Sequence, residues 1–186
     1  MADGLFYNDL REPFIASDQG AVTLAATAKA LYTASAFPVL GGQYFSRIGK
    51  KVRIRLFGRM TTGLTPGNGS FNVLYGTGAD ANGVLLMTGT PVALVASGTN
   101  LAWWMQIFVH CRSLGSTGTL FCTGEANFNV GLIAAASQPI LLPAATPAVS
   151  GACDLTAALI ISVQFLRSGS TAETMQVHDM EVVAMN

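Results

Sequence analysis

The sequence predicts an all-β fold, an antiparallel β-sandwich of the jelly-roll kind with about eight strands. Two observations lead to this prediction. Short segments alternate between apolar and polar side chains, and a period of two is that of a strand with one buried face. Glycine- and proline-rich links separate these segments, and no stretch has a convincing helical period.

The composition favours one folded domain with an arm. Hydrophobic residues make up 51% of the 186 residues and charged residues only 11%, whereas disordered chains have the opposite balance. We therefore expect a single jelly-roll domain over residues 21–186. Residues 1–20 are acidic and have no clean period, which predicts an extended N-terminal arm.

The mean hydropathy of +0.46 indicates either a membrane protein or an oligomer that buries apolar surface. The longest apolar segment, 130–149, contains Gln138 and three prolines, so we expect no membrane span. No secretory signal is recognisable at the start of the chain, and we expect synthesis in the cytoplasm. Burial of apolar surface between subunits is the preferred explanation.

The early part of the domain predicts one strand and a turn before its clearest element. Residues 21–32 alternate weakly and are expected to form a strand followed by a turn, and proline and glycine then mark a turn at 37–42. The segment 51–60 reads K-V-R-I-R-L-F-G-R-M, with apolar even positions and the basic residues Lys51, Arg53, Arg55 and Arg59 at odd positions. This pattern predicts a strand with one buried and one charged face.

The role of the basic face stays open among three interpretations. The three are a solvated face, a face paired with acids of a neighbouring strand or subunit such as Asp179 and Glu181, and a face that meets an acidic surface or packaged nucleic acid. Because ten acidic residues balance ten basic ones, contact with protein is favoured and a nucleic-acid partner is not expected.

The remaining strands are expected at 70–75, 84–87, 103–111, 120–130, 159–167 and 173–185, and the last of these alternates throughout. Strands 103–111 and 120–130 form a hairpin around the loop 115–118. If Leu114 faces Thr119, then Cys111 faces Cys122, and the pair is either a disulfide or two buried thiols, with thiols favoured. Trp104 and Phe108 lie on the polar side of this hairpin and need a partner surface. Residues 130–156 form a long connection.

No catalytic, metal or cofactor site is expected. The chain has two histidines, His110 and His178, which stand on separate strands without ligand-spaced partners. No serine lies in a G-x-S-x-G turn, and the segment 42–51 lacks the spacing of a phosphate-binding loop. We therefore predict a binding or structural protein and no enzyme.

Partner contacts are predicted in the arm, in the basic strand, in the connection 130–156 and on the outer side of the hairpin. Aromatic residues in an otherwise polar arm favour docking on a neighbouring subunit. The predicted contact residues are Phe6, Tyr7, Phe14, Lys51, Arg53, Arg55, Arg59, Trp104 and Phe108.

Several segments resemble virion proteins of tailed bacteriophages, namely the jelly-roll head-decoration, or cement, proteins. The resemblance covers most of residues 28–180 and is carried by the segments 28–32, 37–45, 49–55, 75–83 and 155–173. It implies a homotrimer on the capsid exterior that fastens neighbouring major capsid proteins. The alternative is a phage tail or receptor-binding jelly roll that recognises a cell-surface glycan, with Trp103, Trp104 and Phe108 as a stacking platform.

Overall fold

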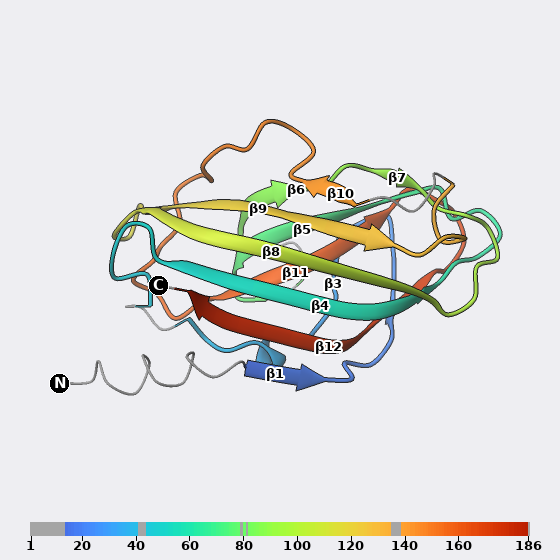
Figure 1. The fold of residues 1–186 in the computed structure, drawn as a ribbon, viewed down its shortest axis with the longest axis horizontal. Coiled ribbons are helices and arrows are strands. Elements are labelled where there is room, and N and C mark those ends of the chain that lie inside the picture. The colour runs from blue at the N-terminus through green and yellow to red at the C-terminus, as the bar shows by residue number, and fades with distance from the viewer. Residues whose placement is uncertain (1–13, 41–43, 79, 81, 135–138, 186) are drawn as a thin grey trace.

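The chain folds as two antiparallel sheets packed face to face, in a computed structural model that describes residues 14–40, 44–78, 80, 82–134 and 139–185. Figure 1 shows the seven-stranded sheet in front of the five-stranded sheet. The all-β sandwich is therefore confirmed, and no α-helix occurs in these ranges. None of the helical structure there is long and apolar enough to cross a membrane.

The strand order places the chain's first and last long strands side by side. The seven-stranded sheet has the order β1-β12-β4-β8-β9-β10, with β2 beside β12. The five-stranded sheet has the order β3-β11-β5-β6, with β7 beside β5. The strands are β1 (Phe14–Ser17), β2 (Val22–Thr23), β3 (Lys29–Ala30), β4 (Lys51–Thr61), β5 (Asn68–Gly76), β6 (Val84–Thr88), β7 (Val92–Ala93), β8 (Leu101–Ser113), β9 (Thr119–Phe128), β10 (Ile140–Leu142), β11 (Ile160–Arg167) and β12 (Thr174–Met185).

The nested pairing of β4 with β12 and of β5 with β11 gives the sandwich a jelly-roll-like topology. The described part of the chain has twelve strands where about eight were predicted. The additional ones are short strands such as β2, β7 and β10, which have too few residues to show a period. The predicted single strand over 21–32 is wrong for the same reason. It is two short strands, of which β2 joins one sheet and β3 the other.

The inner faces of the two sheets form one core. Along β4 the residues alternate as the sequence predicts, and Val52, Ile54 and Leu56 are fully buried. An aromatic cluster fills the space between the sheets, in which the ring centroids of neighbouring members lie 4.9–6.3 Å apart. Its members are Phe71, Trp103, Phe128 and Phe165.

The β8–β9 hairpin has the predicted faces but a register two residues away from the predicted one. Ser113 closes the hairpin against Thr119, and Cys111 lies opposite Leu120 instead of Cys122. A bulge at Arg112 adds one residue to β8, and the loop is one residue longer than predicted because Leu114 belongs to it. The bulge and the longer loop each shift the register by one residue. A total shift of two residues leaves every side chain on its predicted face, so the core is unaffected. Cys111 and Cys122 are buried thiols, as favoured.

The predicted strict alternation of the last strand fails at one place. A bulge between Val177 and Asp179 interrupts the pairing of β12 with β4. Both His178 and Asp179 consequently face outward, between the buried residues Val177 and Met180. A bulge re-aims side chains in this way, and here it brings His178 to the open face of the sheet.

The described part of the predicted arm runs along the edge of the seven-stranded sheet. Strand β1 pairs with β12, and the backbone amides of Asp18 and Gln19 donate hydrogen bonds of 2.8 Å to the carbonyl oxygens of His178 and Val177. Phe14 therefore belongs to a strand of this sheet. Phe6 and Tyr7 lie outside the described residues.

Candidate binding surface

The two sheets differ in what covers their outer faces. In β11 even the residues that alternate away from the core are buried, and Ser162 and Gln164 are each 1% exposed. In β4 the corresponding residues are half-buried or exposed along the whole strand. The open face of the sandwich is therefore the outward side of β12, β4, β8 and β9, which we call the outer face.

The register arranges the outer face in rows that cross the strands. One row consists of Asp179, Phe57, Trp104 and Asn127, from β12 through β4 and β8 to β9. Six residues towards the start of β4, another row contains Lys51, His110 and Phe121. At about 3.3 Å per residue these two rows lie about 20 Å apart.

Between these rows, the basic residues of β4 meet an acid of the same chain. The Glu181 carboxylate accepts a hydrogen bond of 2.9 Å from Arg53 Nη2, and Arg55 Nη1 lies 3.5 Å from its other oxygen. The predicted pairing with Glu181 is thus confirmed within the subunit. Asp179, the other predicted acid, lies opposite Phe57 because of the bulge in β12.

The end of the outer face nearest the β8–β9 turn combines cations with aromatic rings. Lys51 Nζ lies 5.7 Å from the centroid of the Phe108 ring, and the Arg112 guanidinium lies 5.1 Å from that of Phe121. The His110 ring contacts Phe121 edge-on, with centroids 6.1 Å apart. A cation over the face of an aromatic ring is attracted by that ring, and the contact stabilises both side chains. We call these five residues the basic–aromatic patch.

Exposed apolar side chains surround the basic–aromatic patch. Ile48 is 65% exposed, Val149 53% and Leu114 45%. Ile48 precedes Gly49, whose amide bonds to the carbonyl oxygen of Cys111, and Val149 forms a bridge with Phe121. Large apolar side chains that gather around rings and cations are typical of a surface that meets another protein.

The charges of the basic–aromatic patch act on its histidine. Burial lowers the pKa of His110 below its ordinary value, and the neighbouring positive charges of Lys51 and Arg112 lower it further. The neutral imidazole is therefore the favoured form in the folded protein.

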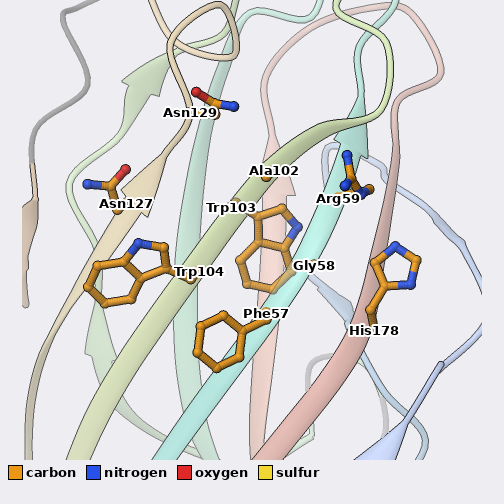
Figure 2. Close-up of a pocket in the computed structure, with 9 residues that line it drawn as sticks. All are labelled: Phe57, Gly58, Arg59, Ala102, Trp103, Trp104, Asn127, Asn129 and His178. Atoms are coloured by element: carbon orange, nitrogen blue, oxygen red, sulfur yellow. The ribbon is translucent and has the colours of Figure 1, made fainter.

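The opposite end of the outer face holds an open hollow of about 390 Å³ (Figure 2). Phe57 and Trp104, which are cross-strand neighbours, supply aromatic rings, and the Trp103 ring also lines the hollow. Polar side chains stand around these rings, namely Arg59, Asn127, Asn129 and His178. We call this site the Trp104 hollow.

Close packing fixes the strands beneath the Trp104 hollow. A Cβ atom on Gly58 would lie 2.0 Å from the carbonyl oxygen of Gln176 and 2.7 Å from the Trp103 ring, so only glycine fits there. Trp103 itself is 2% exposed and belongs to the aromatic cluster of the core. The prediction that Trp103 belongs to an exposed stacking platform is therefore wrong, because the alternation along β8 turns Trp103 inward and Trp104 outward.

Hydrogen bonds orient the polar rim of the Trp104 hollow. Arg59 Nη1 donates to the carbonyl oxygen of Asn100 at 2.9 Å. His178 Nδ1 and Gln176 Nε2 each lie 2.9 Å from Asp18 Oδ1, which joins the segment after β1 to the face of β12. The backbone amide of Asn129 donates to the carbonyl oxygen of Ala102 at 2.9 Å and fixes the end of β9.

A second, larger groove of about 780 Å³ runs beside the middle of the outer face. One wall is formed by Phe108, Thr123 and Glu125, and the other by the connection after β10. Leu141 of β10, which also lines the groove, is 74% exposed. That the connection 130–156 contacts a partner stays a prediction. At this groove the connection borders the outer face.

The structure brings six of the nine predicted contact residues onto one face, which are Lys51, Arg53, Arg55, Arg59, Trp104 and Phe108. Sequence reasoning did not name as contact residues several that complete the two ends of this face, namely Phe57, Phe121, Asn127, Asn129 and His178. Phe57 carried a signal, since it replaces a basic residue in the odd-numbered series of β4.

The described residues form no cluster of metal ligands and expose no cysteine thiol. Within the described ranges, no group of three or more histidine, cysteine or acidic side chains could hold a metal ion. Cys111, Cys122 and Cys153 are buried, and burial raises the pKa of all three thiols, which keeps them protonated.

Comparisons with known proteins leave the family of this chain open. No protein-family model matches it, and no curated protein matches it. Among solved structures it is similar to the metal-free form of lectin I-B4 from Griffonia simplicifolia, with 11% sequence identity and a TM-score of 0.40. The alignment covers 92% of this chain and 93% of the lectin chain. A likeness at this level carries no argument about what the chain binds.

Proposed function

We propose that this chain is a structural protein of a bacteriophage particle that binds the outer surface of the capsid and stabilises the lattice of major capsid proteins. The sequence resemblance supplies the identity of the partner. The basic–aromatic patch is the observation that supports the contact, because it gathers rings, cations and exposed apolar side chains at one end of an uncovered face.

The chemistry of the patch suits a protein surface better than nucleic acid. Aromatic residues and arginine carry most of the binding energy in protein interfaces, and Phe108, Phe121 and Arg112 are of these types. A nucleic-acid interface would need a field of unpaired positive charge. Here Arg53 and Arg55 are paired with Glu181, and the whole chain has no net charge.

The position of the patch implies how the protein sits on the capsid. The patch lies where β4 begins and where the β8–β9 hairpin turns (Figure 1). When the protein attaches through this end, its long strands project outward from the capsid lattice. The Trp104 hollow, about 20 Å further along the strands on the same face, then lies away from the lattice.

The proposed oligomer is a homotrimer. Apolar side chains outside the patch leave surface for subunit contacts, among them Leu64, which is 75% exposed, and Val130, which is 70% exposed. Light scattering of the purified protein measures the mass directly. A stable monomer at working concentration would remove both the trimer and the explanation of the high mean hydropathy.

Reconstituting capsids that lack this protein tests the proposal. Purified protein is added, and bound protein is measured by co-sedimentation and by cryo-EM occupancy of the capsid exterior. We expect saturable binding that weakens at least about tenfold when Arg112→Ala and Phe121→Ala are combined.

Lys29→Ala is the matched control for this experiment. Lys29 is a cation near the five-stranded sheet, paired with Asp80 at 2.7 Å, and its loss should leave capsid binding unchanged. Full occupancy by the Arg112/Phe121 variant would contradict the contact. Density on the tail instead of the head would favour the alternative role of a receptor-binding module.

A further inference from the structure

The Trp104 hollow has a composition that the capsid contact does not use. It lies at the other end of the outer face from the basic–aromatic patch, and its lining combines the rings of Phe57, Trp103 and Trp104 with two carboxamides, an arginine and a histidine. Ligand sites in proteins are typically concave, largely apolar and provided with a few polar groups that fix orientation. Its volume of about 390 Å³ lies near the lower end of the range for such sites and suits one or two small rings.

Phe57 and Trp104 form the outward-facing aromatic part of the hollow, and the Arg55 guanidinium lies 5.5 Å from the centroid of the Phe57 ring. Phe57 is 36% exposed and Trp104 is half-buried, and the register places them directly opposite each other on β4 and β8. The faces of aromatic rings carry partial negative charge and attract positively polarised hydrogens. The C–H face of a pyranose ring presents a row of such hydrogens.

The polar part of the hollow suits hydroxyl groups. Asn127 lies opposite Trp104 in the register, and Asn129 follows it at the end of β9. A carboxamide offers both a donor and an acceptor, and a sugar hydroxyl needs both from its partner. In Figure 2 both amide groups lie on the β9 side of the rings, and Arg59 and His178 lie on the other side.

The charges around the hollow disfavour an anionic ligand. The one permanently charged lining group is the Arg59 guanidinium, and the Asp18 carboxylate lies at the rim, with its Oδ1 2.9 Å from His178 Nδ1. Asp179 belongs to the same outer-face row and is exposed. A nucleotide would bring phosphate towards this carboxylate, whereas an uncharged sugar avoids that repulsion.

We propose that the Trp104 hollow binds a neutral pyranose of a glycan, with the ring stacked on Trp104 and Phe57 and its hydroxyls bonded to Asn127 and Asn129. This inference does not rest on the proposed capsid function, because the hollow and the patch share no residue. A capsid-bound copy would present the sugar site outward, where it could attach the particle to a glycosylated surface.

The test is an NMR titration of the purified, ¹⁵N-labelled full chain with methyl glycosides of glucose, galactose, mannose and N-acetylglucosamine. We expect at least one glycoside to bind saturably with a Kd of roughly millimolar strength, typical of a single small ring. The indole signal of Trp104 and the side-chain amide signals of Asn127 and Asn129 should shift together.

Variants locate the binding. Trp104→Ala and the milder Asn127→Ala should each weaken binding of that glycoside at least about tenfold, which is a loss of one hot-spot contact. Phe121→Ala removes an aromatic ring of the same outer face at its other end and should leave binding unchanged. If Trp104→Ala does not fold, Asn127→Ala and Asn129→Ala decide the matter.

Two results would overturn the proposal. One is the absence of saturable binding of any of the four glycosides. The other is saturable binding of adenosine monophosphate or of a tryptophan-containing peptide at these signals while all glycosides fail. Because no capsid is present in this assay, its failure leaves the capsid proposal standing, and loss of capsid binding leaves the sugar site standing.

Discussion

The two ends of the outer face are built on the same strands but have different chemistry. At one end, Lys51 and Arg112 lie over the rings of Phe108 and Phe121, and apolar loops surround them. At the other end, Phe57 and Trp104 form an open hollow with carboxamides on its rim. Cations with apolar surroundings suit a large protein surface, whereas rings with neutral amides suit a small neutral ligand.

The difference arises from positions a few residues apart on shared strands. Strand β4 supplies Lys51 to one end and Phe57 to the other, and β8 supplies Phe108 and Trp104. The half-buried outer face thus carries two sites, and the packed inner face of the same strands supports both of them.

The largest effect is expected from Gly58→Ala, beneath the Trp104 hollow. The new methyl group would meet the carbonyl oxygen of Gln176 at 2.0 Å, and neither the backbone of β12 nor the Trp103 ring can move away freely. We expect a loss of about 3 kcal/mol in the free energy of unfolding, measured by urea denaturation. Gly20→Ala is the control, since nothing lies within 4 Å of its added methyl group. Equal stability of the two variants would contradict the packing described.

A smaller effect is expected from Trp104→Ala and Phe121→Ala, one at each end. Both side chains are half-buried on the outer face, so each variant should lose no more than about 1 kcal/mol of stability. The two variants should therefore match in thermal unfolding and differ only in binding. If either one unfolds the protein, that residue belongs to the core and its end of the face is not a free site.

Glu181→Gln tests the ion pairs that lie between the two ends of the outer face. It removes the carboxylate that Arg53 and Arg55 share, and these groups are partly exposed, so the cost should be about 0.5 kcal/mol and should shrink with added salt. Stability curves at low and high ionic strength measure it. A salt-independent loss of several kcal/mol would mean that the pair is a buried structural element.

The smallest effect is expected from pH at the basic–aromatic patch. The folded protein lowers the pKa of His110 below its ordinary 6.5, so the unfolded chain binds the proton more readily. This histidine therefore contributes stability above about pH 6.5 that is lost as the pH falls through and below that value. His110→Gln should flatten this part of the stability profile between about pH 7.5 and 5.5. A steeper acid loss in the variant would contradict the assigned direction.

The sequence predicted best what depends on one strand at a time. The eleven residues of β4 alternate without interruption, so their faces followed from the pattern alone, and Glu181, which pairs with Arg53, was one of the two acids named as partners of the basic face. The faces of β8 and β9 were equally accessible, because a shift of two residues leaves them unchanged.

What the sequence did not predict depends on register between strands. The row of Phe57, Trp104 and Asn127 exists only when β4, β8 and β9 are aligned, and bulges at Arg112 and His178 alter such alignments by one residue each. No pattern in a single strand marks a bulge of this kind. The Trp104 hollow therefore could not be predicted from the sequence, although Trp104 itself was assigned to the outer face.

The most direct test of the binding account is a cryo-EM reconstruction of capsids carrying the bound protein, at a resolution that orients the sandwich. We predict that the end bearing Lys51, Arg112 and Phe121 contacts the major capsid protein and that Trp104 faces the solvent. Attachment through the Trp104 end, through the five-stranded sheet, or the absence of any density on the capsid exterior would contradict it.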